Sequence, residues 1–487
     1  MNLSVLLQDF KNDPRIFSLA DRITMSAPSH TFLKDLHGSA SQFVVTAIFQ
    51  HESCAQINHL VVLNDAEEAA YFHNTLENLT GALDLFYFPA SFKNKKNFKL
   101  LNSSHVMLRT EALTRLSAGG NKKIIITYPE ALFEKVVLPN TLSENIIRIK
   151  SNDSLNVDKL LGQFVDYGFT RTDFVYEPGQ FAVRGGILDI YSFGNEKPYR
   201  VELFGNEVDS IRVFDPETQL SERKLLQVTI IPNIETQFES GEKISLLEFL
   251  PENTAVWVQD WDVVREKIEV QEEDLHFFLE LMRETEGKKI NSRDDDDKVE
   301  KENIQESDFI KAVDIEKLLK QRHLVEFGYR PSEGVSLEIV FATREQPAFN
   351  RQFEMLIRDL KEKEAKKYSI YLFAENPRQL ERLHSIFVDL KADIPLTPVP
   401  VSIHEGFIDD DLKVVCYTDH QIFQRYHKYK VKQAYNKSKA LTIRTLRELQ
   451  PGDYVTHIDH GVGVYSGLQK LEANGKLQEA VRIIYKD

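Results

Sequence analysis

The chain has 487 residues, of which 42% are hydrophobic and 28% are charged. This length exceeds what a single hydrophobic core supports, so the sequence predicts several globular domains. The formal net charge of −15 opposes the phosphate attraction on which non-specific nucleic-acid binding depends, and this argues against DNA binding by this segment.

Two further features of the composition bear on the compartment. The two cysteines, Cys54 and Cys416, lie far apart in the sequence, which argues against a disulfide framework and for a reducing environment. No stretch reaches the roughly 20 apolar residues that a membrane helix needs, and the N-terminus lacks the basic and apolar regions of a secretory signal. We therefore expect a cytoplasmic protein.

The first predicted domain alternates short apolar runs with helical patterns. Strands are expected at 59–63, 84–88 and 123–129, with helices at 66–79 and 105–116 between them. Short buried strands that alternate with helices predict a parallel sheet.

A glycine turn at 37–43 stands where a nucleotide-binding chain would place its phosphate loop. A working loop needs glycines, a lysine for the phosphates and a serine or threonine for Mg²⁺. After Gly38, however, Ser41 and Gln42 occupy the positions of that lysine and hydroxyl residue. We predict a degenerate loop that simply connects a strand to a helix, with no catalytic residue and no cofactor.

A helix at 159–167 is followed by a strand-rich block from 174 to about 231, with hairpin turns at Gly185-Gly186 and Gly205-Asn206. This pattern predicts a separate α+β domain. Within it, the strand at 199–204 alternates between two faces, one with Val201 and Leu203 and one with Arg200, Glu202 and Phe204. In the preceding strand the same alternation buries Phe181 and Val183 and turns Gln180, Ala182 and Arg184 outward.

Arginine and phenylalanine side by side on an outward strand face are typical of protein interfaces. The alternative is an ion pair on an edge strand beside one incidentally exposed phenylalanine, and the residues alone leave both interpretations open. Outward strand residues are also expected to contribute little to stability.

The next stretch, 243–326, carries helices and an acidic run at 293–298 that we interpret as a solvated loop. A helix at 349–361, a strand at 368–373 and a helix from Pro377 predict a small α/β domain without a catalytic pattern. A polar, basic stretch at 431–444 is interpreted as a connector.

The last piece opens with a turn at 449–453 and continues into short strands bent by glycines, with a hairpin turn at Asn474-Gly475. These features predict a small β-barrel, which the chain is expected to leave incomplete. His457 and His460 do not predict a metal site, because residues three apart on a strand point to opposite faces.

Two blocks resemble the bacterial transcription-repair coupling factor (Mfd) family. The first reads EPGQFAVRGGILDIY at 177–191, PYRVELF at 198–204 and DSIRVFD at 209–215, and it is similar to the module that this family shares with the excision-repair helicase UvrB. The second reads PGDYV at 451–455 and HIDHGVG at 457–463, and it resembles the RNA polymerase interaction domain, a Tudor-like barrel also found in CarD-type regulators.

The resemblance implies a docking protein rather than an enzyme. It implies that UvrA binds through Arg184, Arg200 and Phe204, and that the RNA polymerase β subunit binds near Leu471. It also implies that the first domain is a UvrB-like, RecA-like nucleotide fold that has lost its phosphate-loop residues. ATP, Mg²⁺ and duplex DNA would be bound by motor domains that intact family members carry beyond this segment, and those members are ATP-dependent DNA translocases.

The layout implied by the resemblance divides the chain as follows: 1–146, first part of the UvrB-like domain; 147–232, UvrA-binding α+β module; 233–330, second part of the UvrB-like domain; 331–429, small α/β domain; 430–447, linker; 448–487, RNA polymerase interaction domain. Two rival functions are a UvrB-type ATP-dependent helicase and a CarD-like transcription regulator. Ser41 and Gln42 count against the helicase. UvrA binding would distinguish the coupling factor from the regulator.

Overall fold

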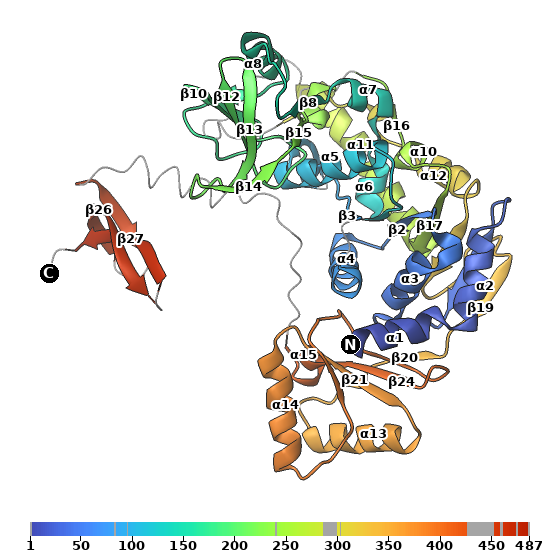
Figure 1. Cartoon of the computed structure of the whole chain (residues 1–487). Helices are drawn as coiled ribbons and strands as arrows, with labels where there is room; N and C mark the ends of the chain where they lie inside the picture. The colour runs from blue at the N-terminus through green and yellow to red at the C-terminus, as the bar shows by residue number, and fades with distance from the viewer. Residues whose placement is uncertain are drawn as a thin grey trace. The chain divides into compact units, whose positions relative to one another are not determined.

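The computed structural model describes residues 2–81, 84–94, 96–238, 241–285, 300–301, 303–425, 452–457, 461–473 and 476–485 (Figure 1). The chain divides into two compact units, the first comprising 1–148, 193–195 and 229–433, and the second 149–192, 196–228 and 434–487. Within the described residues, no helix combines the length and the apolar character that crossing a membrane would require.

The first unit contains a seven-stranded sheet whose neighbouring strands are all parallel, which confirms the predicted parallel sheet. The strands at its centre are buried along their whole length, as expected for a sheet that is covered on both faces. In spatial order they are β19 (Leu337–Val340), β1 (His30–Lys34), β18 (Leu324–Phe327), β17 (Thr254–Gln259), β2 (Asn58–Val62), β6 (Ile124–Thr127) and β3 (Leu85–Tyr87).

Helices and short strands complete this part of the unit. Local signals fix the ends of α4, because Asp65 accepts hydrogen bonds from the N–H groups of Glu67 and Glu68, and Gly81 adopts a left-handed conformation after the last turn. The helices are α1 (Asn2–Lys11), α2 (Pro14–Ile23), α3 (Ala40–Gln50), α4 (Ala66–Thr80), α5 (Ser103–Ser117), α6 (Pro129–Phe133), α7 (Pro139–Glu144), α9 (Ile234–Gln237), α10 (Leu246–Phe249), α11 (Trp261–Thr285) and α12 (Ala312–Leu319). The short strands are β4 (Phe92–Asn94), β5 (Asn97–Leu101), β7 (Val136–Val137) and β16 (Lys243–Ile244). Two more short strands, β8 (Ile147–Lys150) and β15 (Gln227–Ile230), pair with each other, and each includes residues of both units.

The same unit includes a five-stranded mixed sheet, in the order β20 (Thr343–Glu345), β23 (Phe407–Asp409), β24 (Val414–Thr418), β21 (Ser369–Phe373) and β22 (Thr397–Val399). Its helices are α13 (Phe353–Ala365), α14 (Pro377–Asp389) and α15 (Asp419–Ile422), so the predicted helix, strand and helix are confirmed. The two sheets share a core, because the ring of Phe43 on α3 lies 5.3 Å from that of Phe407 and 6.2 Å from that of Phe373.

The second unit contains a six-stranded sheet in the order β14 (Ser221–Leu225), β13 (Glu207–Phe214), β12 (Tyr199–Phe204), β11 (Ile187–Ile190), β10 (Gln180–Arg184) and β9 (Thr170–Arg171). The predicted hairpins at 185–186 and 205–206 are confirmed by the antiparallel pairs β10–β11 and β12–β13. Helix α8 (Val157–Asp166) packs on one face of the sheet, with the Phe164 ring 5.5 Å from that of Phe181.

The C-terminal residues form an antiparallel sheet of three strands, β25 (Tyr454–His457), β26 (Gly461–Ala473) and β27 (Lys476–Ile484). Strands β26 and β27 pair as a hairpin that brings Ala473 opposite Lys476. The predicted turn residues Asn474 and Gly475 lie outside the described residues, as do His460, the acidic run at 293–298 and the basic stretch at 431–444.

Candidate partner-binding face

The predicted face of the six-stranded sheet is set by the register of its strands. Asp189 on β11 stands directly opposite Ala182 on β10 and Arg200 on β12. Arg184 lies two residues after Ala182 on β10, opposite Ile187, and therefore points to the same side as Ala182. Because directly opposed residues of an antiparallel sheet point to the same side, Arg184 and Arg200 share one face with Asp189.

A buried carboxylate joins the two arginines. Asp189 is fully buried, and its Oδ1 and Oδ2 atoms accept hydrogen bonds from Nε and Nη2 of Arg200 at 2.8 and 2.9 Å. Arg184 also donates from Nη2 to Oδ2 of Asp189, and from Nη1 to the carbonyl oxygen of Asp173 at 3.0 Å. The hydrogen bond to Asp189 raises the pKa of Arg200 above its ordinary value, so this guanidinium remains charged.

Each guanidinium also lies over an aromatic ring. Arg184 stands 4.4 Å from the centroid of Phe174, and Arg200 stands 4.5 Å from the centroid of Phe214. Stacking and hydrogen bonding together restrict both side chains to one geometry. The face is therefore organised before any partner arrives.

Exposure differs sharply among the three predicted site residues. Phe204 is 84% exposed, whereas the side chain of Arg184 is 32% exposed and that of Arg200 only 13%. Phe204 and part of Arg184 can therefore touch a partner, while Arg200 mainly holds the buried Asp189. An ion pair and an exposed phenylalanine are both present, as the alternative interpretation expected, although β12 is an inner strand of the sheet and not an edge strand. The interface interpretation stays a prediction.

Two details of the predicted alternation are wrong. Ala182 was expected to face outward, yet it is buried, because its small side chain stands in the row where both arginines converge on Asp189. Val183 and Leu203 were expected in the core, yet both are only half-buried. They lie at the end of the sheet beside the first hairpin, where the N–H of Leu203 donates to the carbonyl oxygen of Gly186 at 2.7 Å.

The loop at 37–39 joins β1 to α3, which confirms the predicted strand-to-helix connection. Ser41 and Gln42 lie in the first turn of α3, where both side chains are buried. The hydroxyl of Ser41 donates to Oε1 of Gln42 at 3.0 Å. The two side chains at the positions of the phosphate-loop lysine and hydroxyl therefore bind each other.

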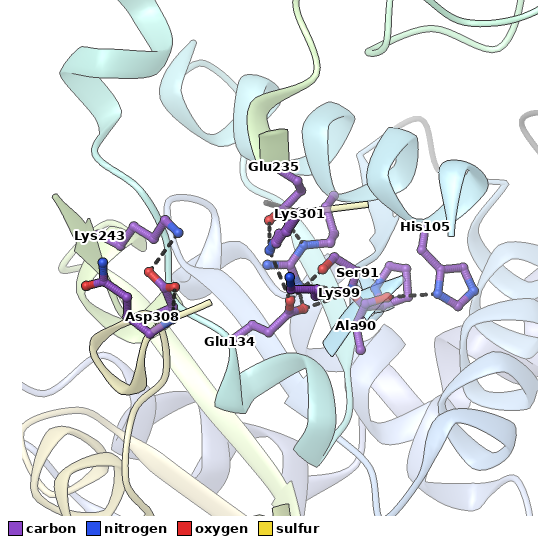
Figure 2. A network of polar contacts seen from close by, with 12 residues as sticks. Ala90, Ser91, Lys99, His105, Glu134, Glu235, Lys243, Lys301 and Asp308 are labelled. Carbon is purple, nitrogen blue, oxygen red and sulfur yellow. Dashed lines mark hydrogen bonds and ion pairs between the residues drawn. The ribbon is translucent and has the colours of Figure 1, made fainter. Parts of the chain in front are cut away.

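A cluster of buried charges lies in the first unit (Figure 2). Glu235 on α9 accepts hydrogen bonds from Nε of Arg109 at 2.8 Å and from Nζ of Lys301 at 2.7 Å. Glu134 lies 3.3 Å from Nη1 of Arg109 and accepts from the N–H of Ser91 at 2.7 Å. No sequence pattern indicated this cluster, since its members lie far apart in the chain.

The charges of this cluster balance, and the arrangement is typical of a structural joint. Burial alone would raise the pKa of the Glu235 carboxyl, but the charges of Lys301 and Arg109 outweigh burial and lower the pKa from 4.5 to about 2. Glu235 follows the point where the chain returns from the second unit to the first. The cluster therefore stabilises the segment in which the chain returns to the first unit.

Leu471, the residue expected near the polymerase contact, lies in β26 opposite Gln478. Its side chain lies outside the described part of the chain.

Comparison with known proteins identifies two matched regions. Residues 147–235 match the model of the UvrB interaction domain, and residues 449–487 match that of the CarD-like/TRCF RID domain. The chain is 25% identical over 532 residues to a transcription-repair-coupling factor of Bacillus subtilis (strain 168), covering 93% of this chain and 43% of that protein. It is also 25% identical over 499 residues to the factor of the same name from Staphylococcus aureus (strain Mu50 / ATCC 700699), covering 89% of this chain and 42% of the relative. The chain thus spans less than half the length of the curated relatives it matches.

Replacing Glu235 tests the buried cluster. We expect Glu235→Gln to lower the free energy of unfolding by about 3–5 kcal/mol, because it leaves Arg109 and Lys301 without a full counter-charge. The pKa of Glu235 is lower in the folded chain than its ordinary value of 4.5, so the stabilisation is complete above about pH 4.5 and is lost as the pH falls towards 2. Urea unfolding between pH 3 and 7 measures both effects, with the exposed Glu284→Gln as control. A variant as stable as the control at pH 7 would contradict this account.

Because Asp189 is buried between the two arginines, we expect that reversing the charge of one arginine lowers the stability of the second unit. We expect Arg200→Glu to destabilise the second unit by about 3–5 kcal/mol, because it sets a carboxylate against the buried Asp189. Arg212→Glu is the matched control, since Arg212 stands opposite Arg200 on β13 but pairs only with the partly exposed Glu202, a contact that contributes about 1 kcal/mol or less. Adding Asp189→Asn to Arg200→Glu should recover part of the loss in urea unfolding. Equal stability of the two reversals would exclude this role for Asp189.

Proposed function

We propose that this chain, a homologue of transcription-repair-coupling factors over most of its length, is the docking part of such a factor and joins an excision-repair protein to RNA polymerase. The six-stranded module would bind UvrA, and the C-terminal hairpin would bind the polymerase β subunit. In this proposal the described domains contribute binding energy and carry out no bond-breaking step.

The observation that carries the proposal is the exposed Phe204 on a sheet that also carries a fixed, partly exposed arginine. Phe204 is 84% exposed at the end of a rigid sheet, and burying such a ring in a partner's pocket contributes strongly to affinity. Arg184 remains partly exposed and is held by Asp189 and Phe174, so little side-chain freedom is lost when a partner binds. An exposed aromatic anchor and a held arginine on the same sheet are features that a protein-binding face needs.

The geometry also indicates what the partner offers. Phe204 requires an apolar pocket, and Arg184 requires a carboxylate or carbonyl oxygen within hydrogen-bond distance of its guanidinium. Because Arg184 and Arg200 share the charge of Asp189, the face is less positive than two free arginines would make it. Such a face selects a partner by shape and hydrogen bonding more than by long-range attraction.

The first domain supports a binding role in a different way. We propose that its fold is a degenerate UvrB-like, RecA-like nucleotide fold, since its parallel sheet places the loop at 37–39 between β1 and α3. Ser41 and Gln42 would leave this loop without the lysine and the Mg²⁺-binding hydroxyl of an ATP hydrolase. ATP, Mg²⁺ and duplex DNA would then be bound by motor domains of the full-length factor, in the cytoplasm.

The C-terminal strands would supply the second contact. Residues 449–487 match the RID model, and the hairpin of β26 and β27 gives this region a framework on which a polymerase subunit could dock. We propose a Tudor-like barrel as the complete form of this domain, with Leu471 in the contact with the polymerase.

The UvrA contact is tested by Phe204→Ala. We expect UvrA affinity to fall about 30-fold, the equivalent of about 2 kcal/mol, because the variant removes the aromatic anchor. The free energy of unfolding should change by less than about 0.5 kcal/mol, since the ring is exposed. Calorimetric titration with purified UvrA measures affinity, and Leu226→Ala, which removes another highly exposed apolar side chain of the module, is the control. Unchanged UvrA binding by Phe204→Ala would refute the site.

The polymerase contact is tested by Leu471→Arg. We expect this variant to lose measurable binding to the isolated β subunit, because a buried, unpaired arginine at an interface costs several times the thermal energy. Glu472→Arg introduces the same side chain at the neighbouring position of β26 and serves as control. If Leu471→Arg binds as tightly as the control, the contact lies elsewhere on this domain.

A further inference from the structure

The 402–406 segment, which links β22 to β23 in the five-stranded sheet, lies against the loop at 37–39 and against α4. All three elements belong to the first compact unit. Two of its backbone groups bind Ser39, because the N–H of Ser39 donates to the carbonyl oxygen of Glu405 at 3.1 Å and the N–H of Glu405 donates to Oγ of Ser39 at 3.0 Å. A single serine thus pairs with both backbone polar groups of one residue, Glu405.

This pairing changes how α3 begins. Ser39 occupies the N-cap position of α3, where a serine side chain usually accepts a hydrogen bond from the first turn of the helix. Here the side chain makes no such bond and accepts from Glu405 instead. The free N–H groups of a helix N-terminus attract phosphate and other anions in nucleotide-binding folds. At this helix the carbonyl oxygen of Glu405 approaches the same end.

One face of α4 binds the other half of the segment. Tyr71, Thr75 and Asn78 lie four and three residues apart, so they follow one face of the helix. Oγ1 of Thr75 accepts from the N–H of His404 at 3.1 Å, and Nδ2 of Asn78 donates to the carbonyl oxygen of Ser402 at 2.8 Å. The ring of Tyr71 stacks on that of His404, with centroids 3.6 Å apart and an angle of 16° between the planes.

Gly38 allows the close approach of the segment to the loop, and Gly406 allows the segment to fit against its own domain. A Cβ atom on Gly38 would lie 2.6 Å from the carbonyl oxygen of Gly406, and Gly38 has a φ of +54° that side chains disfavour. A Cβ atom on Gly406 would lie 2.7 Å from the carbonyl oxygen of Cys416. Gly81 has nearly the same φ, +57°, but open space around it. Alanine at position 81 would therefore introduce backbone strain alone, whereas alanine at position 38 would introduce the same strain and a collision with the segment.

The segment is held equally firmly by its own domain. Ile403 is fully buried, the N–H of Gly406 donates to Oε1 of Gln421 at 2.7 Å, and Nε2 of His420 donates to the carbonyl oxygen of His404 at 2.8 Å. Movement of the segment away from Ser39 would consequently move or strain the sheet to which it belongs.

We infer that the loop at the phosphate-loop position serves as a socket for the 402–406 segment and fixes the small α/β domain to the first domain. A backbone carbonyl of this same chain takes the place at α3 that a phosphate group takes in a nucleotide-binding fold. The inference is independent of partner binding, and it gives the small domain a role that its sequence did not indicate. A phosphate and the 402–406 segment would compete for the N–H of Ser39, so this socket and a nucleotide site exclude each other.

Hydrogen exchange on the full chain tests the socket. We expect Gly38→Ala to raise the exchange rates of the His404 and Glu405 amides on the order of tenfold, because the new methyl group collides with the segment and weakens both its contacts. Gly81→Ala carries the same backbone strain without the collision, and it should leave these two amides unchanged. The amides of β17 report on the fold as a whole and should remain protected in both variants.

A second variant keeps the test decisive if Gly38→Ala unfolds. Ser39→Gly removes the hydroxyl that accepts from Glu405 and retains an acceptable N-cap, so it should raise exchange at Glu405 several-fold with β17 unaffected. A local increase in either variant supports the socket. Unchanged exchange at His404 and Glu405 in Ser39→Gly, together with unchanged or only global exchange in Gly38→Ala, would overturn it.

Discussion

A carboxylate without access to water must be paired with cations and hydrogen-bond donors, and this requirement organises the partner face of the second unit. Asp189 is fully buried, and its two oxygens receive three donor groups from Arg184 and Arg200. The arginines are consequently fixed by the demands of the fold before they meet a partner. In the proposed complex, affinity and stability would depend on the same atoms, because a change that frees an arginine for binding also leaves the buried carboxylate of Asp189 short of a partner.

The same requirement operates where the chain re-enters the first unit. Glu235 lies among Arg109 and Lys301, and Glu134 completes a cluster in which two cations face two anions (Figure 2). Removing any one of these four side chains would leave a buried charge without a partner and would destabilise the fold. The cluster therefore stabilises the segment in which the chain returns from the second unit to the first.

Local patterns predicted the elements well, and they failed where the answer depended on strand register. The alternation at 199–204 placed Arg200 and Phe204 on one face, and the glycines at 185–186 and 205–206 marked both hairpins, because these features repeat at short range. The convergence of Arg184 and Arg200 on Asp189 requires knowing which residues stand opposite each other on three strands. Arg109 and Glu235 are 126 residues apart, and no periodicity relates them. Exposure was misjudged for Ala182 for the same reason, since long neighbouring side chains converge on its row.

The loop at 37–39 combines a strand, a glycine turn and a helix N-terminus without the lysine and the hydroxyl that bind phosphate and Mg²⁺ in nucleotide-binding loops. A strand followed by a glycine turn and a helix N-terminus presents backbone N–H groups whether or not a lysine and a hydroxyl follow. In this chain the N–H of Ser39 donates to the carbonyl oxygen of Glu405, while the N–H groups of Ala40 and Gln42 donate to the carbonyl oxygens of His37 and Ser39. A peptide carbonyl from a neighbouring segment can thus occupy this end of α3 without a mobile ligand. An intramolecular acceptor brings no translational entropy cost of its own, which favours the segment over a free phosphate in the competition for this N–H. Gly38 is needed in this arrangement for the approach of Gly406, just as a phosphate-loop glycine is needed for the approach of a phosphate.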